Sequence, residues 1–179
     1  MYHGNLIKNI SKKFYKINIS GLEFDSKNIK KDNIFFAFKG NKDDGNRYIS
    51  EAIKRGARVI VSDKKFNINK KNIILINDKN PRKLLGEISY KLLIRRPKNL
   101  IAVTGTNGKS SVSNFYYQIL NLNNKKTASI GTIGIQFENK NKIISNTTLD
   151  PIKLRKTINH LSKKKIDNVY LSGVIPPIV

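Results

Sequence analysis

Hydrophobic residues along the chain fall into two kinds of pattern. Short continuous apolar runs, as in Ile34–Phe38 and Leu100–Val103, predict buried strands. Stripes in which apolar residues recur every three or four positions, as in Leu84, Ile88 and Leu92, predict helices that bury one face. Because runs and stripes alternate along the chain, the sequence predicts an α/β fold.

Polar turns and helix caps mark where these elements begin and end. Asn80-Pro81 and Asp150-Pro151 each place a capping side chain before a proline at the first helical position. Ile133–Phe137 and Lys142–Ser145 flank a polar turn, which predicts a hairpin. The other predicted elements are strands at 21–26, 57–61, 73–76, 127–130 and 167–171 and helices at 47–55 and 154–161.

A turn with two glycines joins the strand at 100–103 to a helix whose apolar stripe is Val112, Phe115, Tyr116 and Ile119. Free N–H groups at a helix N-terminus attract phosphate, and glycines let the backbone approach it closely. This turn is therefore predicted to bind nucleotide phosphates through Gly105, Thr106, Asn107, Gly108, Lys109, Ser110 and Ser111.

Two side chains of this turn have specific predicted roles. Lys109 would reach the β- and γ-phosphates, and the Ser110 hydroxyl would hold Mg²⁺. The spacing Gly-x-x-Gly-Lys-Ser differs from the usual phosphate loop, so an ordinary turn with a solvated lysine is the alternative. The strand before the turn and the amphipathic helix after it favour phosphate binding.

Composition limits the classes of function. The formal net charge of +23 suggests a nucleic-acid binder, but the lysines do not gather on one stripe, and a general bias toward Lys, Asn and Ile explains the charge better. The absence of cysteine excludes disulfides and thiol nucleophiles. His3 and His160 are far apart and have no carboxylate cluster beside them. Without a signal peptide or a membrane-length apolar run, the chain is expected to be cytoplasmic.

Several segments together resemble the Mur ligases, the ATP-dependent amino-acid ligases of peptidoglycan synthesis. Their N-terminal domain is matched by residues 24–27, 32–40, 44–49 and 52–57. Thr104–Ser111 resembles their ATP loop, which accounts for the unusual spacing. Ile130–Gly134 and Asn146–Pro151 are similar to the members that add the third residue of the stem peptide. The resemblance extends to about Val169.

The resemblance implies substrate-binding residues in three places. Phe24 and Ser26 would hold the uridine nucleotide. The loop over the diphosphate would be formed by Asn41, Lys42 and Asp43, and contacts to the muramoyl peptide by Asn146, Thr147 and Thr148. The alternatives are a plain turn hydroxyl at Ser26, a solvated loop at 41–43, and strand-end residues at 147–148.

The resemblance also implies an activity with ATP and Mg²⁺ as cofactors. Such an acid–amino-acid ligase phosphorylates the D-Glu carboxylate of UDP-MurNAc-L-Ala-D-Glu, and a diamino acid, meso-diaminopimelate or L-Lys, then attacks the acyl phosphate. Lys109, the loop amides and Mg²⁺ would neutralise the charge on the transferred phosphoryl group.

Two domains are expected: a UDP-sugar-binding domain over 1–97 and a partial ATP-binding domain over 98–179. The second part has too few elements for a complete nucleotide-binding sheet, and Ser172 stands where the family has a magnesium-binding Glu, so we expect a truncated chain without ligase activity of its own. The alternatives are a non-catalytic UDP-muramoyl-peptide-binding module, a nucleic-acid binder, or a folate-type polyglutamate ligase, which has a similar ATP loop but lacks the pattern at 24–56.

Overall fold

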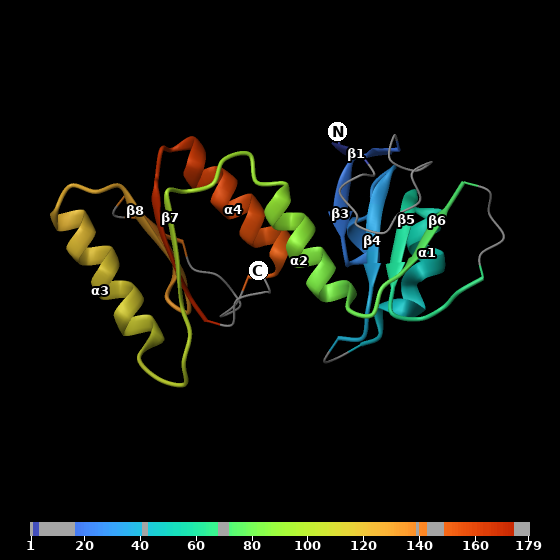
Figure 1. Ribbon diagram of the computed structural model, residues 1–179, viewed down its shortest axis with the longest axis horizontal. Helices are drawn as coiled ribbons and strands as arrows, with labels where there is room; N and C mark the ends of the chain where they lie inside the picture. Colours follow the sequence, from blue (N-terminus) through green and yellow to red (C-terminus); the bar gives the residue numbers. More distant parts are fainter. Residues whose placement is uncertain are drawn as a thin grey trace. The chain divides into compact units, whose positions relative to one another are not determined.

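The computed structural model describes residues 2–3, 17–40, 43–67, 72–138, 140–142 and 149–173. The chain divides into two compact units, Met1–Lys91 and Leu92–Val179, and each is described by itself (Figure 1). This division falls a few residues before the boundary proposed near residue 97. Among the described residues, no helix combines the length and the apolar character that crossing a membrane requires.

The first unit contains a parallel four-stranded sheet in the order β3-β4-β5-β6. Its strands are β3 (Gly21–Glu23), β4 (Asn33–Ala37), β5 (Ala57–Ser62) and β6 (Ile74–Asn77). Its helices are η3 (Ser26–Asn28), η4 (Gly45–Tyr48), α1 (Ile49–Lys54) and α2 (Pro81–Lys91). A separate antiparallel pair joins β1 (Tyr2–His3) and β2 (Asn18–Ile19).

The central strand of this sheet confirms the predicted buried run. All five residues of β4 are buried, as expected for a parallel strand that is covered on both faces. Phe35 and Ala37 share a core with α1, while α2 contacts β4 as well. The predicted cap of α2 is confirmed, because the Asn80 side chain accepts the Lys83 N–H at 3.0 Å.

The second unit contains a five-stranded sheet in the order β10-β9-β8-β11-β7. Three strands are parallel, and β9 and β10 form an antiparallel hairpin beside them. The strands are β7 (Asn99–Val103), β8 (Thr127–Gly131), β9 (Gly134–Phe137), β10 (Lys140–Lys142) and β11 (Asn168–Ser172). The hairpin is confirmed, although β10 begins inside the predicted turn. The predicted second strand of that hairpin, at 142–145, lies mostly outside the described residues.

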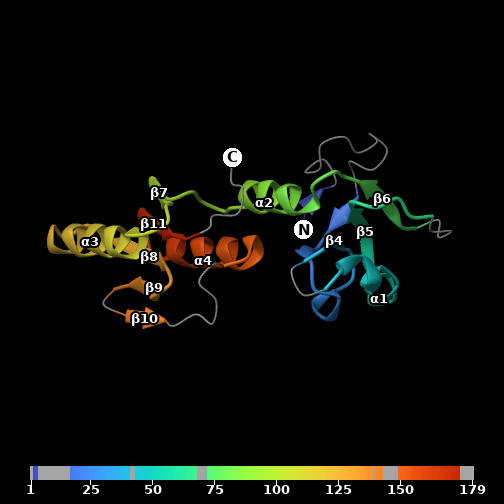
Figure 2. The same cartoon turned by 90° about the horizontal axis from the view of Figure 1, so that it is seen from below.

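Two helices, α3 (Lys109–Leu122) and α4 (Pro151–Lys163), lie on either side of this sheet (Figure 2). The core on the α4 side joins Leu154, Ile158 and Leu161 to apolar residues of β8 and β11. Asp150 caps α4 by accepting the Lys153 N–H at 2.8 Å, as predicted.

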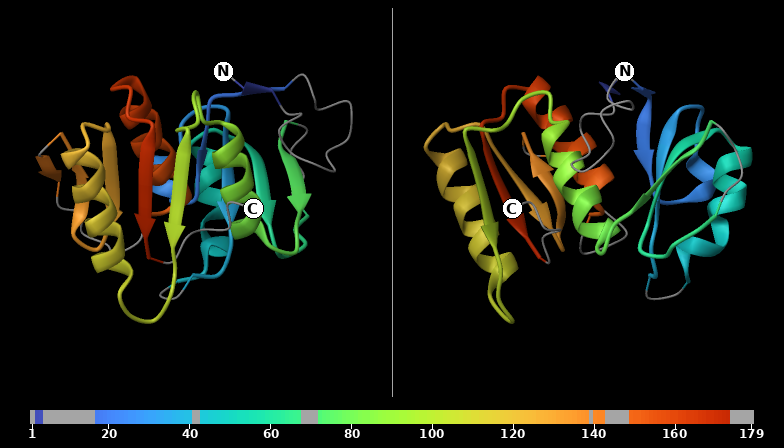
Figure 3. Two further views of the ribbon diagram at one scale, coloured as in Figure 1. Left: turned by 60° about the vertical axis from the view of Figure 1, so that its left-hand side comes forward. Right: turned by 45° about the vertical axis from the view of Figure 1, so that its right-hand side comes forward.

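The predicted burial of Leu100–Val103 is wrong. Each residue of β7 is exposed or only half-buried, and Ile101 remains 39% exposed. The reason is topological, because β7 is the last strand of the sheet and only β11 pairs with it among the described strands (Figure 3, left). A parallel strand buries its residues only when neighbours and helices cover it.

The predicted helix over the stripe at 112–119 is present, but most of its apolar face is not covered by the sheet, which the stripe contacts through the stacking of Tyr116 on Tyr170 of β11. Ser113 and Tyr117 are the residues of α3 that are buried. The stripe itself is exposed, at 41% for Val112, 60% for Phe115, 48% for Tyr116 and 55% for Ile119. The helix therefore presents a stripe of apolar side chains that the described part of this unit does not cover.

Candidate functional site

The glycine turn lies at the edge of the sheet where the parallel strands end. It follows the C-terminal end of β7 and leads directly into α3, and ligands of α/β sheets bind at this edge. Gly105 has a φ of +144° and Gly108 a φ of +78°, both in the region that favours glycine. The structure therefore brings Gly105–Ser111 together in one turn whose backbone requires its two glycines.

The N-terminus of α3 leaves backbone donors available. Gly108 is the N-cap and has no side chain that could accept them. The first intrahelical bond runs from the Val112 N–H to the Gly108 carbonyl, at 2.9 Å. The N–H groups that precede it have no intrahelical acceptor, so this helix end can bind an anion.

Lys109 folds back over the turn instead of extending away from it. Its ammonium donates to the carbonyl oxygens of Gly105 at 2.6 Å and Thr106 at 3.0 Å. The positive charge is therefore held by the same loop whose backbone would surround a phosphate. Of the two serines that follow, Ser110 is half-buried and Ser111 is exposed.

Ser172 lies beside this turn, at the end of the neighbouring strand β11. It pairs in register with Val103, the last residue before the turn, and is only 7% exposed. A Cβ at Gly131 would approach the Ser172 Oγ to 1.8 Å, so the serine occupies space that only a glycine on β8 leaves open. Among the described residues, no group of three or more His, Cys, Asp or Glu side chains is placed to hold a metal.

Phe24 takes part in an aromatic cluster in the first unit. Its ring stacks on Phe38 with 6.2 Å between centroids, and the Arg82 guanidinium lies 4.9 Å from the Phe38 centroid. These residues come from the ends of β3 and β4 and the first turn of α2. Phe38 and Arg82 were not among the predicted site residues. Two features of the sequence point to them: Phe38 is the aromatic end of the apolar run 34–38, and Arg82 directly follows the Asn80-Pro81 cap.

Ser26, the other proposed uridine contact, is bonded within the fold. It is 5% exposed, and its hydroxyl donates to Glu51 at 2.8 Å. That hydrogen bond, followed by the Arg55 guanidinium 2.9 Å away, lowers the pKa of Glu51. The hydrogen bond from Ser26 to Glu51 therefore connects η3 to α1. The Ser26 oxygen can still accept a hydrogen bond from a ligand.

Asp43 is the one residue of the proposed diphosphate loop at 41–43 that the structure describes. It accepts a hydrogen bond from the Tyr48 hydroxyl, which lowers the pKa of Asp43, and the pKa of the neighbouring Asp44 is lowered to about 2, chiefly by Lys64 at 2.7 Å. Both carboxylates therefore serve as anchors of the loop. The remaining proposed substrate residues, Asn41, Lys42, Asn146, Thr147 and Thr148, lie outside the described residues.

Both units match models of one protein family. Residues 18–92 match the Mur ligase family, catalytic domain, and residues 103–171 match the Mur ligase middle domain. The chain belongs to the Mur ligase family. This confirms the resemblance drawn from the sequence motifs, and the second match begins at the strand that leads into the glycine turn.

Two curated relatives of this Mur ligase chain share the name UDP-N-acetylmuramoyl-L-alanyl-D-glutamate--2,6-diaminopimelate ligase. The relative from Rickettsia montanensis is 39% identical over 163 residues, covering 89% of this chain and 34% of the relative. The relative from Wigglesworthia glossinidia brevipalpis is 39% identical over 171 residues, covering 90% and 34%. The chain thus spans about a third of the length of the curated relatives it matches.

Solved Mur ligase structures share the fold. A UDP-N-acetylmuramoyl-L-alanyl-D-glutamate--2,6-diaminopimelate ligase superposes with a TM-score of 0.79 at 21% identity, covering 97% of this chain and 36% of that one. A MurF ligase from Thermotoga maritima in complex with ADP superposes with a TM-score of 0.55 at 21% identity. This match covers 84% of this chain and 31% of the MurF chain. These likenesses confirm the α/β architecture.

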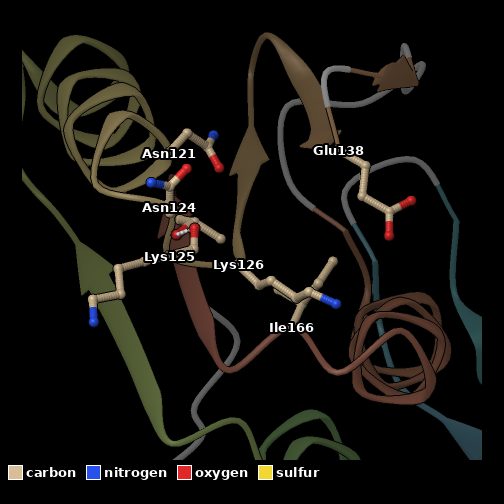
Figure 4. A pocket seen from close by; sticks show the side chains of 7 residues that line it. Asn121, Asn124, Lys125, Lys126, Glu138 and Ile166 are labelled. Atoms are coloured by element: carbon tan, nitrogen blue, oxygen red, sulfur yellow. Dashed lines mark hydrogen bonds between the residues drawn. The ribbon is translucent and has the colours of Figure 1, made fainter.

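A polar pocket of this Mur ligase chain lies away from the glycine turn (Figure 4). It is lined by the C-terminal end of α3, the starts of β8 and β11, and Glu138. Because the strands are parallel, their starts and their ends lie at opposite edges of the sheet. The pocket is therefore separate from the turn that follows β7.

Proposed function

We propose that this chain provides the ATP-binding turn and the UDP-sugar-binding unit of a ligase that joins 2,6-diaminopimelate to UDP-MurNAc-L-Ala-D-Glu. The observation that carries the proposal is the glycine turn at the N-terminus of α3, at the ligand-binding edge of a parallel sheet. The names of relatives that are 39% identical supply the substrate.

In the proposed reaction, the γ-phosphoryl group of ATP passes to the D-Glu carboxylate, and ADP leaves. The amine of the diamino acid attacks the acyl phosphate, an amide forms, and inorganic phosphate leaves with the bonding electron pair. The Lys109 ammonium and the turn's N–H groups would stabilise negative charge on the phosphoryl oxygens.

Magnesium binding by this chain would depend on hydroxyl oxygens. Ser110 is half-buried in the first turn of α3, and Ser172 is the neighbouring strand-end hydroxyl. Mg²⁺ keeps several waters and is held partly by substrate phosphates, so one serine ligand fits it. Ser110 would hold the ion, which would neutralise charge on the nucleotide.

Uridine recognition is proposed at the aromatic cluster of the first unit. Phe24 and Phe38 are both half-buried, so part of their surface remains open to a base. Base–aromatic stacking contributes roughly 1–3 kcal/mol. Ser26 and the loop at 41–43 stay proposed contacts to the nucleotide, and residues 146–148 to the muramoyl peptide.

Titration calorimetry of the whole chain separates the two halves of this proposal. MgATP binding should be lost in Lys109→Ala and in Gly108→Val, while UDP-muramoyl-dipeptide binding should be lost in Phe24→Ala and kept in both turn variants. Equal MgATP affinity in the wild type and in Lys109→Ala would refute the ATP assignment. The chain without added partner should form no amide from ATP, dipeptide substrate and diaminopimelate.

A further inference from the structure

The polar pocket at the C-terminal end of α3 has no part in the proposed ligase activity (Figure 4). Its volume is about 230 Å³, below the roughly 300–1,000 Å³ of pockets that enclose a drug-sized ligand, so it suits a smaller molecule. Four of its lining side chains carry N–H donors, namely Asn121, Asn124, Lys125 and Lys126. Within the described part of the chain, none of these four side chains has a hydrogen-bond or ion-pair partner. The donors are therefore available to a ligand.

The backbone of the turn from α3 to β8 is held by its own hydrogen bonds. The Lys125 N–H bonds back to α3 at 2.9 Å, and Asn124 has a left-handed φ of +57°, as at many helix ends. The Lys125 carbonyl accepts from the Thr127 hydroxyl at 2.9 Å, and the Lys126 carbonyl accepts from the Asn168 side chain at 3.1 Å. Because these two carbonyl oxygens already accept hydrogen bonds, the turn offers chiefly donors, and a ligand has to supply the acceptors.

Positive charge gathers at the edge of the sheet where the parallel strands begin. β7, β11 and β8 start side by side, because β11 pairs in register with both of the others. Basic residues make up three of the seven residues in the connection 92–98, two of the four in 123–126 and two of the four in 164–167. The whole sequence has 35 among 179. The fold therefore brings together at this edge basic residues that are dispersed along the sequence.

The acidic residues near this edge already have basic partners. Asp167 forms an ion pair with Arg95 at 2.6 Å. Glu138, which lines the pocket, forms one with Lys164 at 3.3 Å. The two pocket lysines form no ion pair with any residue that the structure describes. Their positive charge is therefore left for an anionic ligand.

We propose that this pocket binds a small dicarboxylate. Its two carboxylates accept hydrogen bonds from the ammonium groups of Lys125 and Lys126 and from the amides of Asn121 and Asn124. Phosphate is a poorer ligand, because its charge favours helix N-termini, whereas the pocket lies at the C-terminus of α3, which carries about half a negative charge. The two lysines outweigh that half charge for singly charged carboxylates. The site goes beyond the proposed function and does not require ATP binding.

The test is titration calorimetry of the whole chain with succinate at low ionic strength, where charges are least screened. The wild type should bind one succinate, and amide chemical shifts should change at 121–127. Lys125→Gln/Lys126→Gln should weaken binding about tenfold or more, because both charged donors are lost. Asn124→Gly should weaken it about threefold, because glycine keeps the left-handed backbone while one amide donor is lost. Succinamide, which has the same length and no charge, should not bind.

Lys153→Gln/Lys156→Gln is the matched control. It also removes two positive charges, but both lysines are exposed on α4 and neither lines the pocket. This variant should bind succinate like the wild type, and thermal unfolding should show that all variants fold. Four results would each overturn the proposal: no succinate binding, equal weakening by the two double variants, tighter binding of inorganic phosphate than of succinate, or chemical-shift changes at 105–111 in place of 121–127.

Discussion

The helices α3 and α4 lie on the two faces of one sheet, yet they relate to it in opposite ways. In α4 the apolar residues are buried, and three exposed lysines, Lys153, Lys156 and Lys163, occupy the outer side. In α3 the buried residues are a serine and a tyrosine, Ser113 and Tyr117, whereas the apolar residues Val112, Phe115 and Ile119 stay exposed. The apolar face of α4 is buried against the sheet of its own unit. The apolar face of α3 is larger than the surface that the described part of the unit covers.

An inner strand of the first unit and the edge strand of the second show the same contrast. β4 has strands on both sides and helices on both faces, and it is buried throughout. β7 has an equally apolar sequence, but it has a neighbour on one side and is nowhere fully buried. Burial of a strand is therefore decided by the elements around it, and β7 carries the glycine turn at the margin of its unit.

The largest expected effect lies in α4. Ile158 is 2% exposed in the core on that side of the sheet, so Ile158→Ala should lower the free energy of unfolding by about 2–5 kcal/mol. Urea denaturation of the whole chain, followed by far-UV circular dichroism, measures it. A loss below about 1 kcal/mol would contradict the idea that α4 packs against a complete core.

A smaller loss is expected where α3 does meet the sheet. Ser113 is 1% exposed and its hydroxyl lies 2.9 Å from that of Ser129 on β8. Ser113→Ala leaves the Ser129 hydroxyl without this partner and should cost about 1–3 kcal/mol. If removing both hydroxyls in Ser113→Ala/Ser129→Ala costs no less than the single change, the pair does not act as a hydrogen-bonded unit.

The N-terminal caps of the two helices should also differ. Asp150 caps α4 through its side chain, so Asp150→Ala should cost about 1 kcal/mol. Gly108 caps α3 through its backbone at a φ of +78°, so Gly108→Ala should cost about 1–2 kcal/mol from strain alone, since a Cβ there meets no atom within 4 Å. Urea denaturation of both variants at one pH compares them. If Gly108→Ala leaves the free energy of unfolding unchanged, the turn adopts a backbone conformation other than the one with a φ of +78° at this residue.

The smallest effect is expected on the exposed stripe of α3. Phe115 is 60% exposed, so Phe115→Ser should change the free energy of unfolding of the isolated chain by no more than about 0.5 kcal/mol. The same substitution should reduce binding of dyes that recognise exposed apolar surface. A destabilisation as large as that of Ile158→Ala would show that the stripe already has a packing partner within the chain.

Local patterns in the sequence were enough to locate most elements and the turn. Asn80-Pro81 and Asp150-Pro151 gave correct helix starts because a cap is a contact between near neighbours. The burial of Leu100–Val103 was mispredicted because it depends on what lies beyond the edge of the sheet. The Phe38–Arg82 contact and the Ser26–Glu51 bond were missed because each joins residues far apart in the chain.

The role of the glycine turn is tested most directly by amide chemical shifts of the isotope-labelled whole chain as MgATP is added. The account predicts saturable changes at Gly105–Ser111 and at the end of β11, and none at Asn124–Lys126 on the opposite edge of the sheet. Changes centred on Asn124–Lys126, with the turn unaffected, would contradict the assignment of this turn as the nucleotide site.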